Sequence, residues 1–373
     1  MKLLLTGHEE RYAIEQLQLS LFPGEQMEPV YGPFQGDGAE SILSRGEVYL
    51  TATTVIWYRG RKSQCVRRMH LEAETVQLRR RLLQRSYYGA ACPLLPEPPP
   101  WGALAGVRPT KITTKFLMEG GSLRAAGTML KQIYYVTPTR RQLCLEASQA
   151  TVQAAKLLGP RDISLYVGIP FCPTRCAYCS FVSQSVEKSF ALVDPYVDAL
   201  VAEIRAGGEM VRRAGLRVRS FYMGGGTPTT LTAEQMDRVL TAFEDAFDTA
   251  FCEEITVEAG RPDTITAEKL AVLKAHGVTR VSVNPQTMED HVLRAIGRHH
   301  TAGDIEAAME LVAKYGFPHV NMDLIAGLPE DTPEGFRRSL DRCLDFGTDN
   351  VTVHTLALKK GSRILLEGLA IPG

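Results

Sequence analysis

The chain has 373 residues, and its 42 basic side chains are balanced by 42 acidic ones. This length fits two domains, and a hydrophobic content of 45% is enough to build sizeable cores. The balanced charge argues against a dedicated nucleic-acid or membrane-surface protein. No apolar stretch approaches the roughly 18 residues of a membrane span, and the N-terminal leucine run is too short for a signal peptide. We therefore expect a cytoplasmic protein.

The first 155 residues mix strand and helix signals. The predicted elements are a strand at Glu47–Tyr58, a helix at Leu71–Gln84, a loop or linker at Pro93–Pro100, and mostly helical structure from Lys111 to Ala155. Basic side chains concentrate in Arg59–Arg85, where they could bind RNA or an anionic substrate, or form the solvated face of a helix. We predict an α+β accessory domain over residues 1–155.

From about residue 163, short β-rich runs alternate with amphipathic helical stretches. The predicted strands are Ile163–Ile169, Val218–Met223, Glu254–Ala259, Thr279–Asn284, His319–Ile325 and Asn350–His354. The predicted helices are Pro195–Ala214, Ala233–Phe247, Ala267–His276, Gly303–Tyr315 and Pro333–Phe346. Thr232, Thr266 and Thr332 are helix-start signals, since each stands just before an acidic first turn.

Strand–helix alternation at this spacing predicts parallel strands joined by helical crossovers. About six such units predict an α/β fold, a partial parallel (β/α)6 barrel over residues 160–360, with its chemistry at the C-terminal ends of the strands. No closing element follows the last predicted strand. We therefore expect residues 361–373 to begin a C-terminal region of a longer protein.

Three of the eight cysteines crowd into one short segment. Cys172, Cys176 and Cys179 have the spacing C-x3-C-x2-C directly after a predicted strand. Three thiolates in one loop can ligate three irons of a [4Fe–4S] cube and leave the fourth iron open to a chelating molecule. Structural zinc is the alternative, but it usually takes four Cys or His ligands, the fourth of which would have to come from His299 or His300.

A glycine run, Gly224-Gly225-Gly226-Thr227-Pro228-Thr229, ends the second predicted strand of this domain. Without side chains at three positions, the backbone can approach a ligand closely and offer it carbonyl and amide groups. A glycine run often marks only a turn. This one stands one strand after the cysteine loop and at the same end of the predicted sheet, which favours a binding role.

The two motifs together resemble those of the radical S-adenosylmethionine (SAM) superfamily. The finer resemblance is to the oxygen-independent coproporphyrinogen III oxidase (dehydrogenase) family, and within it to the HemZ variant. It is carried by the segments Leu165–Cys172, Gly224–Thr229, Val257–Ala259, Pro285–Thr287, Gly297-Arg298 and Asn321–Pro329, and for the variant by Glu258–Asp263 and Asn284–Met288. The chain departs from the family at Gly168, where some members have a histidine, and the family's C-terminal domain is not visible.

The resemblance implies an oxidoreductase of heme (porphyrin) biosynthesis that decarboxylates propionate side chains of a porphyrinogen to vinyl groups. It also implies an electron donor of the flavodoxin or ferredoxin type. The three cysteines would hold the catalytic cluster, and a SAM molecule on the open iron would contact Tyr166, Gly225 and Glu258. Positions that the family uses for a second SAM are matched by Gly226, Thr227, Gln286, Arg298 and Asp323.

Two other functions remain open on the sequence. Sister proteins of this family carry heme, so a heme-binding chaperone without dehydrogenase activity is one alternative. The basic first part of the chain suggests RNA modification as another, although aromatic residues are too thinly spread there for a typical single-stranded RNA surface.

Overall fold

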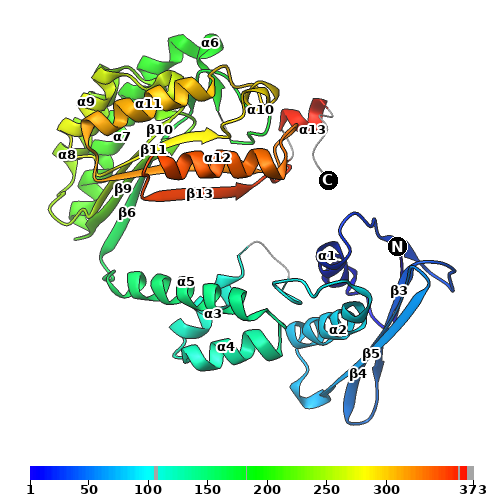
Figure 1. Ribbon diagram of the computed structural model, residues 1–373. Coiled ribbons are helices and arrows are strands. Elements are labelled where there is room, and N and C mark those ends of the chain that lie inside the picture. Colours follow the sequence, from blue (N-terminus) through cyan, green and yellow to red (C-terminus); the bar gives the residue numbers. More distant parts are fainter. Residues whose placement is uncertain (105–107, 182, 360–361, 368–373) are drawn as a thin grey trace. The chain divides into compact units, whose positions relative to one another are not determined.

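The computed structural model describes residues 1–104, 108–181, 183–359 and 362–367. The chain divides into two compact units, Met1–Leu158 and Gly159–Gly373 (Figure 1). The stretch predicted to begin a C-terminal region lies largely outside the described residues; within it, Arg363–Glu367 forms helix α13. In the part of the chain that the structure describes, no helix has both the length and the apolar character that a bilayer crossing requires.

The first unit is a mixed sheet with helices. Its strands are β1 (Lys2–Thr6), β2 (Glu28–Val30), β3 (Gly38–Arg45), β4 (Tyr49–Tyr58) and β5 (Arg61–His70), in the order β2-β1-β3-β4-β5. Its helices are α1 (Arg11–Leu21), α2 (Val76–Ala91), α3 (Thr110–Met118), α4 (Leu123–Gln132) and α5 (Pro138–Lys156), with 3-10 turns at Leu71–Ala73 and Cys92–Leu94. Residues of α1 and α2, such as Ile14 and Leu83, form a core with the sheet.

The basic stretch of this unit differs from the prediction of one solvated helix face. Arg61–His70 is strand β5, paired antiparallel with β4 along its whole length. The helix that follows begins later than predicted because the Thr75 side chain caps it, accepting from the Leu78 backbone N–H at 3.2 Å. On that helix, Arg79 and Arg80 form ion pairs with Glu10.

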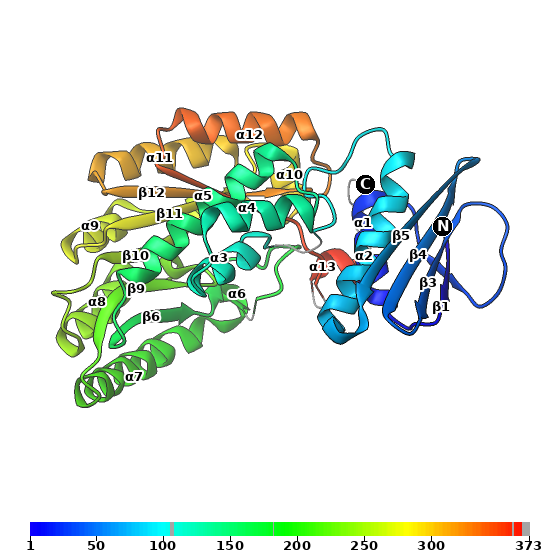
Figure 2. The same cartoon turned by 90° about the horizontal axis from the view of Figure 1, so that it is seen from below.

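The second unit contains a six-stranded parallel sheet in its described part, with the order β13-β12-β11-β10-β9-β6 (Figure 2). The strands are β6 (Asp162–Ile169), β9 (Arg217–Gly225), β10 (Glu254–Gly260), β11 (Arg280–Gln286), β12 (His319–Ala326) and β13 (Asn350–Thr355). The helices are α6 (Val186–Ser189), α7 (Val193–Arg213), α8 (Ala233–Ala246), α9 (Ala267–Ala275), α10 (Asp290–Ala295), α11 (Ala302–Tyr315) and α12 (Pro333–Asp345), with 3-10 turns at Phe190–Leu192, Pro228–Thr230 and Pro262–Thr264. The predicted α/β half-barrel is thereby confirmed.

Side chains alternate between the two faces of this sheet, as strand geometry requires. One set packs in a core with helices α7, α8, α9, α11 and α12; it includes Val167, Met223, Val257, Val283 and Leu324. The intervening residues face the opposite side, where they line a cavity; they include Tyr166, Tyr222, Glu258, Asn284 and Asp323. The apolar side chains must be buried against the helices, so the polar side chains that alternate with them face the cavity.

The cysteine loop leaves the C-terminal end of β6. It begins in the short strand β7 (Phe171–Cys172), which pairs in parallel with β8 (Gln184–Ser185). Because β9 ends beside β6, the glycine run lies next to this loop. Two backbone hydrogen bonds fix the contact: the Gly226 N–H donates to the Ile169 carbonyl at 2.7 Å, and the Thr227 N–H to the Phe171 carbonyl at 2.8 Å.

Candidate active site

A cavity of about 840 Å³ lies on the polar face of the half-barrel. It is lined by all of the site residues predicted from the sequence, which are Tyr166, Cys172, Cys176, Cys179, Gly225, Gly226, Thr227, Glu258, Gln286, Arg298 and Asp323. These residues span more than 150 positions of the chain and come from five of the six parallel strands or from the loops after them. The fold therefore gathers them in one place, while their individual roles stay predictions.

The three cysteines are presented by a loop whose backbone makes hydrogen bonds both within the loop and to Ile296. The Cys179 N–H donates to the Cys176 carbonyl at 3.2 Å, and the Ala177 N–H donates to the Ile296 carbonyl at 2.9 Å. Burial raises the pKa of the Cys172 and Cys179 thiols. Metal ligation requires thiolates, so binding of iron here has to release these protons.

The donor set fits an iron–sulfur cluster. Three thiols face one cavity, and sulfur is the ligand that such clusters take from proteins. Gly226 leaves room beside them, since a Cβ atom at this position would lie 3.0 Å from the Cys172 Sγ. In a [4Fe–4S] cube each cysteine thiolate binds a different iron, so the three cysteine sulfurs need not converge on a single point.

The alternative zinc ligands lie elsewhere. His299 and His300 line a separate cavity of about 350 Å³ with Asp263 and Asp304, while the cysteines line the large one. Among the described residues, no group of three or more His, Cys, Asp or Glu side chains is arranged to hold a single metal ion. The structure does not bring either histidine to the cysteine loop.

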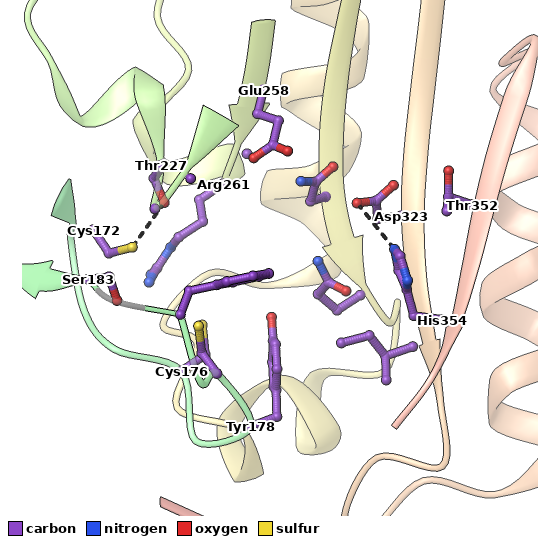
Figure 3. A pocket seen from close by; sticks show the side chains of 18 of the residues that line it. Cys172, Cys176, Tyr178, Ser183, Thr227, Glu258, Arg261, Asp323, Thr352 and His354 are labelled. Carbon is purple, nitrogen blue, oxygen red and sulfur yellow. Dashed lines mark hydrogen bonds and ion pairs between the residues drawn. The ribbon is translucent and has the colours of Figure 1, made fainter. Parts of the chain in front are cut away.

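Glu258 lies on β10, in the cavity wall that β6, β9 and β10 form (Figure 3). Its carboxylate accepts a hydrogen bond from the Tyr222 hydroxyl at 2.5 Å and another from the Gly225 backbone N–H. The Tyr222 ring stacks on Tyr166 with centroids 5.9 Å apart. Burial, together with the nearby charge of Asp323, raises the pKa of Glu258. A carboxylate so placed is held in one orientation and is poorly solvated, as suits a group that binds hydroxyl or ammonium donors.

The raised pKa predicts that Glu258→Gln stabilises the ligand-free protein at neutral and alkaline pH. The stability linked to protonation of Glu258 is fully present below the ordinary glutamate pKa of about 4.3 and is lost as the pH rises through the raised value. The variant should therefore unfold at a higher temperature than wild type at pH 8, and the difference should shrink as the pH falls toward 5. Thermal unfolding followed by circular dichroism measures this, with Glu310→Gln on the exposed face of α11 as the control. Equal shifts for both variants would contradict the assignment.

Gln286 has two unusual features at the end of β11. Its φ is +72°, a left-handed conformation that a residue with a long side chain rarely adopts. Its Oε1 atom is buried and has no hydrogen-bond partner among the described residues. Strain and an unsatisfied buried acceptor tend to occur where a ligand completes the site. On the neighbouring strand, Asp323 accepts from Asn321 Nδ2 at 2.7 Å and lies 3.8 Å from His354 Nε2.

Two residues that were predicted to contact SAM also reach the cysteine loop. The Thr227 hydroxyl donates to the Cys172 Sγ at 3.6 Å, as marked in Figure 3. The buried Arg298 donates from Nη2 to the Tyr178 hydroxyl at 3.1 Å and from Nη1 to the Asn284 carbonyl at 2.6 Å. Both side chains therefore support the loop, whatever else they bind.

Tyr222, His354 and Arg261 also line the cavity and were not predicted from the sequence to act there. The position of each residue explains why it lines the cavity. Tyr222 and His354 occupy cavity-facing positions of β9 and β13, and Arg261 directly follows β10. The two-residue alternation of strands, applied to all six, would have found the first two.

The family model described as "Radical SAM superfamily" matches residues 166–343, which hold all the predicted site residues. The chain is 41% identical over 267 residues to the oxygen-independent coproporphyrinogen-III oxidase-like protein HemZ of Bacillus subtilis, an overlap of 71% of this chain and 53% of that protein. The chain belongs to the radical SAM superfamily, in the coproporphyrinogen III oxidase family. Membership of this superfamily implies a [4Fe–4S] cluster and SAM.

Two further comparisons match 52% and 60% of this chain. The heme chaperone HemW of Lactococcus lactis is 34% identical over 196 residues, which is 52% of this chain and 49% of HemW. The solved structure of coproporphyrinogen III oxidase (HemN) from Escherichia coli, a radical SAM enzyme, matches with a TM-score of 0.52 and 32% identity over 60% of this chain and 52% of that one. The chain thus spans about half the length of the relatives it matches.

Proposed function

We propose that this member of the coproporphyrinogen III oxidase family is a radical SAM dehydrogenase of heme biosynthesis. It would convert propionate side chains of a porphyrinogen into vinyl groups with release of CO₂. The observation that carries the proposal is the convergence of the three cysteines, the glycine run and Glu258 on one cavity. The similarity to HemZ and to HemN supports the same reaction type.

In this proposal, Cys172, Cys176 and Cys179 hold the cluster, and Tyr166, Gly225 and Glu258 hold a SAM molecule beside it. Once bound, the reduced cluster and SAM would supply the one-electron chemistry that removes a hydrogen atom from the β-carbon of a propionate. Loss of CO₂ would then leave the vinyl group, and the one electron released would pass to an external one-electron acceptor.

The side chains of the cavity wall orient the bound molecules. Glu258, held by Tyr222 and by the Gly225 amide, can accept hydrogen bonds from the hydroxyl groups of a ribose. The bare backbone of the glycine run offers carbonyl groups to a ligand ammonium. For a second SAM molecule, the unpaired Oε1 of Gln286 and the carboxylate of Asp323 are the groups we assign.

We further propose a cytoplasmic location and an electron donor of the flavodoxin or ferredoxin type. The cluster has to be reduced before SAM can be cleaved, and an external protein would supply that electron.

We expect coproporphyrinogen III to trigger the release of 5′-deoxyadenosine and CO₂ from the anaerobically reconstituted protein. The reaction needs propionate side chains, so a porphyrinogen with vinyl groups in their place should trigger release of neither 5′-deoxyadenosine nor CO₂. Chromatography of the nucleoside and detection of CO₂ measure the outcome. SAM cleavage with no dependence on the porphyrinogen would argue against this substrate.

A heme-binding chaperone is the second candidate, because HemW is 34% identical over 52% of this chain. An anaerobic heme titration beside the coproporphyrinogen assay separates the two functions. Tight, stoichiometric heme binding without decarboxylation would favour the chaperone.

A further inference from the structure

Arg261 is almost completely buried at the edge of the cavity, with 2% of its surface exposed. It directly follows β10, where Gly260 has a φ of +65° and the pairing of β10 with β11 shifts by one residue. Such a bulge re-aims the side chain that follows it. Here the Arg261 side chain extends toward the loop that carries Cys172 and Cys176 (Figure 3).

The guanidinium of Arg261 has two separate sets of partners. Its Nε and Nη2 donate to the two carboxylate oxygens of Asp263 at 3.0 and 2.9 Å. Its Nη1 donates to the Thr174 hydroxyl at 2.7 Å and to the Thr174 carbonyl at 3.3 Å. A buried guanidinium is costly unless it is paired and hydrogen-bonded, and Asp263 supplies the pairing. The remaining donor is used for Thr174, which lies between the first two cysteines.

We call these contacts of Arg261 with Asp263 and Thr174 the anchor of the loop, and they continue beyond Asp263. The Nδ1 of the buried His300 lies 3.6 Å from the Asp263 Oδ1. Two residues before His300, Arg298 donates to the hydroxyl of Tyr178, which lies between the second and third cysteines. Two buried arginines therefore hold the loop on either side of Cys176, one at Thr174 and one at Tyr178.

We infer that Arg261 is a positioning residue: it fixes the first half of the cysteine loop and places a permanent positive charge beside the Cys172 ligand. The inference rests on the proposed function only in that the loop holds a [4Fe–4S] cluster. The same charge favours the reduced cluster, because reduction adds negative charge. Partners of the ligands and their electrostatics set both the affinity of a metal site and its potential.

The test compares three variants of the full chain after anaerobic reconstitution. Arg261→Gln removes the charge and the fork, Arg261→Lys keeps the charge without the fork, and Thr174→Val removes only the hydroxyl acceptor. The readouts are the rate of iron release to a chelator and the midpoint potential of the cluster from a redox titration followed by electron paramagnetic resonance. Arg219→Gln is the matched control. Arg219 is also a poorly exposed arginine, but it pairs with Asp162 and Glu253 near the start of β9.

We expect Arg261→Gln to release iron roughly 10-fold faster than wild type or more, the range for lost outer partners of metal ligands. Its potential should also move to a more negative value. Arg261→Lys should release iron faster at a nearly unchanged potential. The rate of iron release from Thr174→Val should lie between those of wild type and Arg261→Gln, since the carbonyl of residue 174 still accepts a hydrogen bond from Arg261. Arg219→Gln should match wild type in both measurements.

Wild-type behaviour of Arg261→Gln in both readouts would overturn the inference, as would an equal loss of iron in Arg219→Gln. If Arg261→Gln does not fold, Thr174→Val decides, because iron release at the wild-type rate would refute the anchor. Neither readout involves a porphyrinogen. A stable wild-type cluster without turnover of coproporphyrinogen would therefore remove the proposed substrate and leave the anchor intact, whereas a wild-type chain that takes up no cluster would overturn both.

Discussion

The Cys176→Ala variant should lose both the brown colour of the reconstituted protein and its formation of 5′-deoxyadenosine. Cys176 is the middle one of the three proposed ligands, and only 9% of its surface is exposed. Its removal would leave two thiolates for a cube that is proposed to take three from this loop. Since outer partners alone are worth roughly 10- to 100-fold in metal affinity, loss of a ligand should reduce SAM cleavage by at least about 100-fold. Visible absorbance, iron content and chromatography of the nucleoside measure the result.

The loop itself should survive this substitution, because the backbone hydrogen bonds of Cys176, Ala177 and Cys179 and the contact of Arg261 with Thr174 do not use the Cys176 side chain. The control is Cys252→Ala, a partly buried cysteine that packs against the core of the same unit. It should keep the cluster and the activity of wild type. A Cys176→Ala protein with full iron content and turnover would refute the assignment of the cluster to this loop.

The half-barrel could be predicted from the sequence because its signals are local. The capping threonines are one example: Thr232, Thr266 and Thr332 each accept a hydrogen bond from a backbone N–H three residues later. Each predicted strand of this unit is found, with ends that differ by at most two residues. Helix α10 was missed because it has only six residues, too few to show a helical period.

The first unit was harder to predict because its sheet depends on pairings that no local pattern reveals. Strand β5 has the sequence RKSQCVRRMH, in which charged residues obscure the alternation of exposed and less exposed positions. Only its pairing with β4 makes it a strand. Strand β1 pairs in parallel with β2 and β3, which lie more than 20 residues later. Only β4, rich in Thr and aromatic residues, has a strong strand signal of its own.

In the candidate site too, local patterns could be predicted from the sequence and long-range contacts could not. Every site residue that spacing and family resemblance predicted lines the cavity. Spacing and resemblance could not show that Thr227 and Arg298 contact the cysteine loop, or that Arg261 reaches Thr174 across 87 positions. Such contacts depend on how strand ends meet in space. A Gly-Arg-Pro-Asp run directly after a strand was the available signal for Arg261, but it does not name the partner.

The Gly226→Ala variant should lose the cluster almost as completely as a cysteine variant, although it removes no ligand. A Cβ atom at this position would lie 2.6 Å from the Phe171 carbonyl oxygen and 2.8 Å from that of Ile169. Both are backbone atoms at the point where the chain enters the cysteine loop, so they cannot move aside as a flexible side chain can. The added methyl would also lie 3.0 Å from the Cys172 Sγ. Overpacking of this kind costs typically 1–3 kcal/mol, and the rigid contacts place this case at about 3 kcal/mol or above.

The strain falls on the loop rather than on the core, since the apolar core of this unit lies on the other face of the sheet. We therefore expect Gly226→Ala to remain folded by circular dichroism while its iron and sulfide content falls by most of the wild-type amount. Gly168→Ala is the matched control. It makes the same change at the end of the neighbouring strand, where the new Cβ would meet only a side-chain atom of Tyr166, at 3.4 Å. If both variants keep a full cluster, the close approach of the glycine run is not what shapes the cysteine loop. If only Gly226→Ala loses it, the third glycine is present because the cysteine loop leaves no room for a side chain.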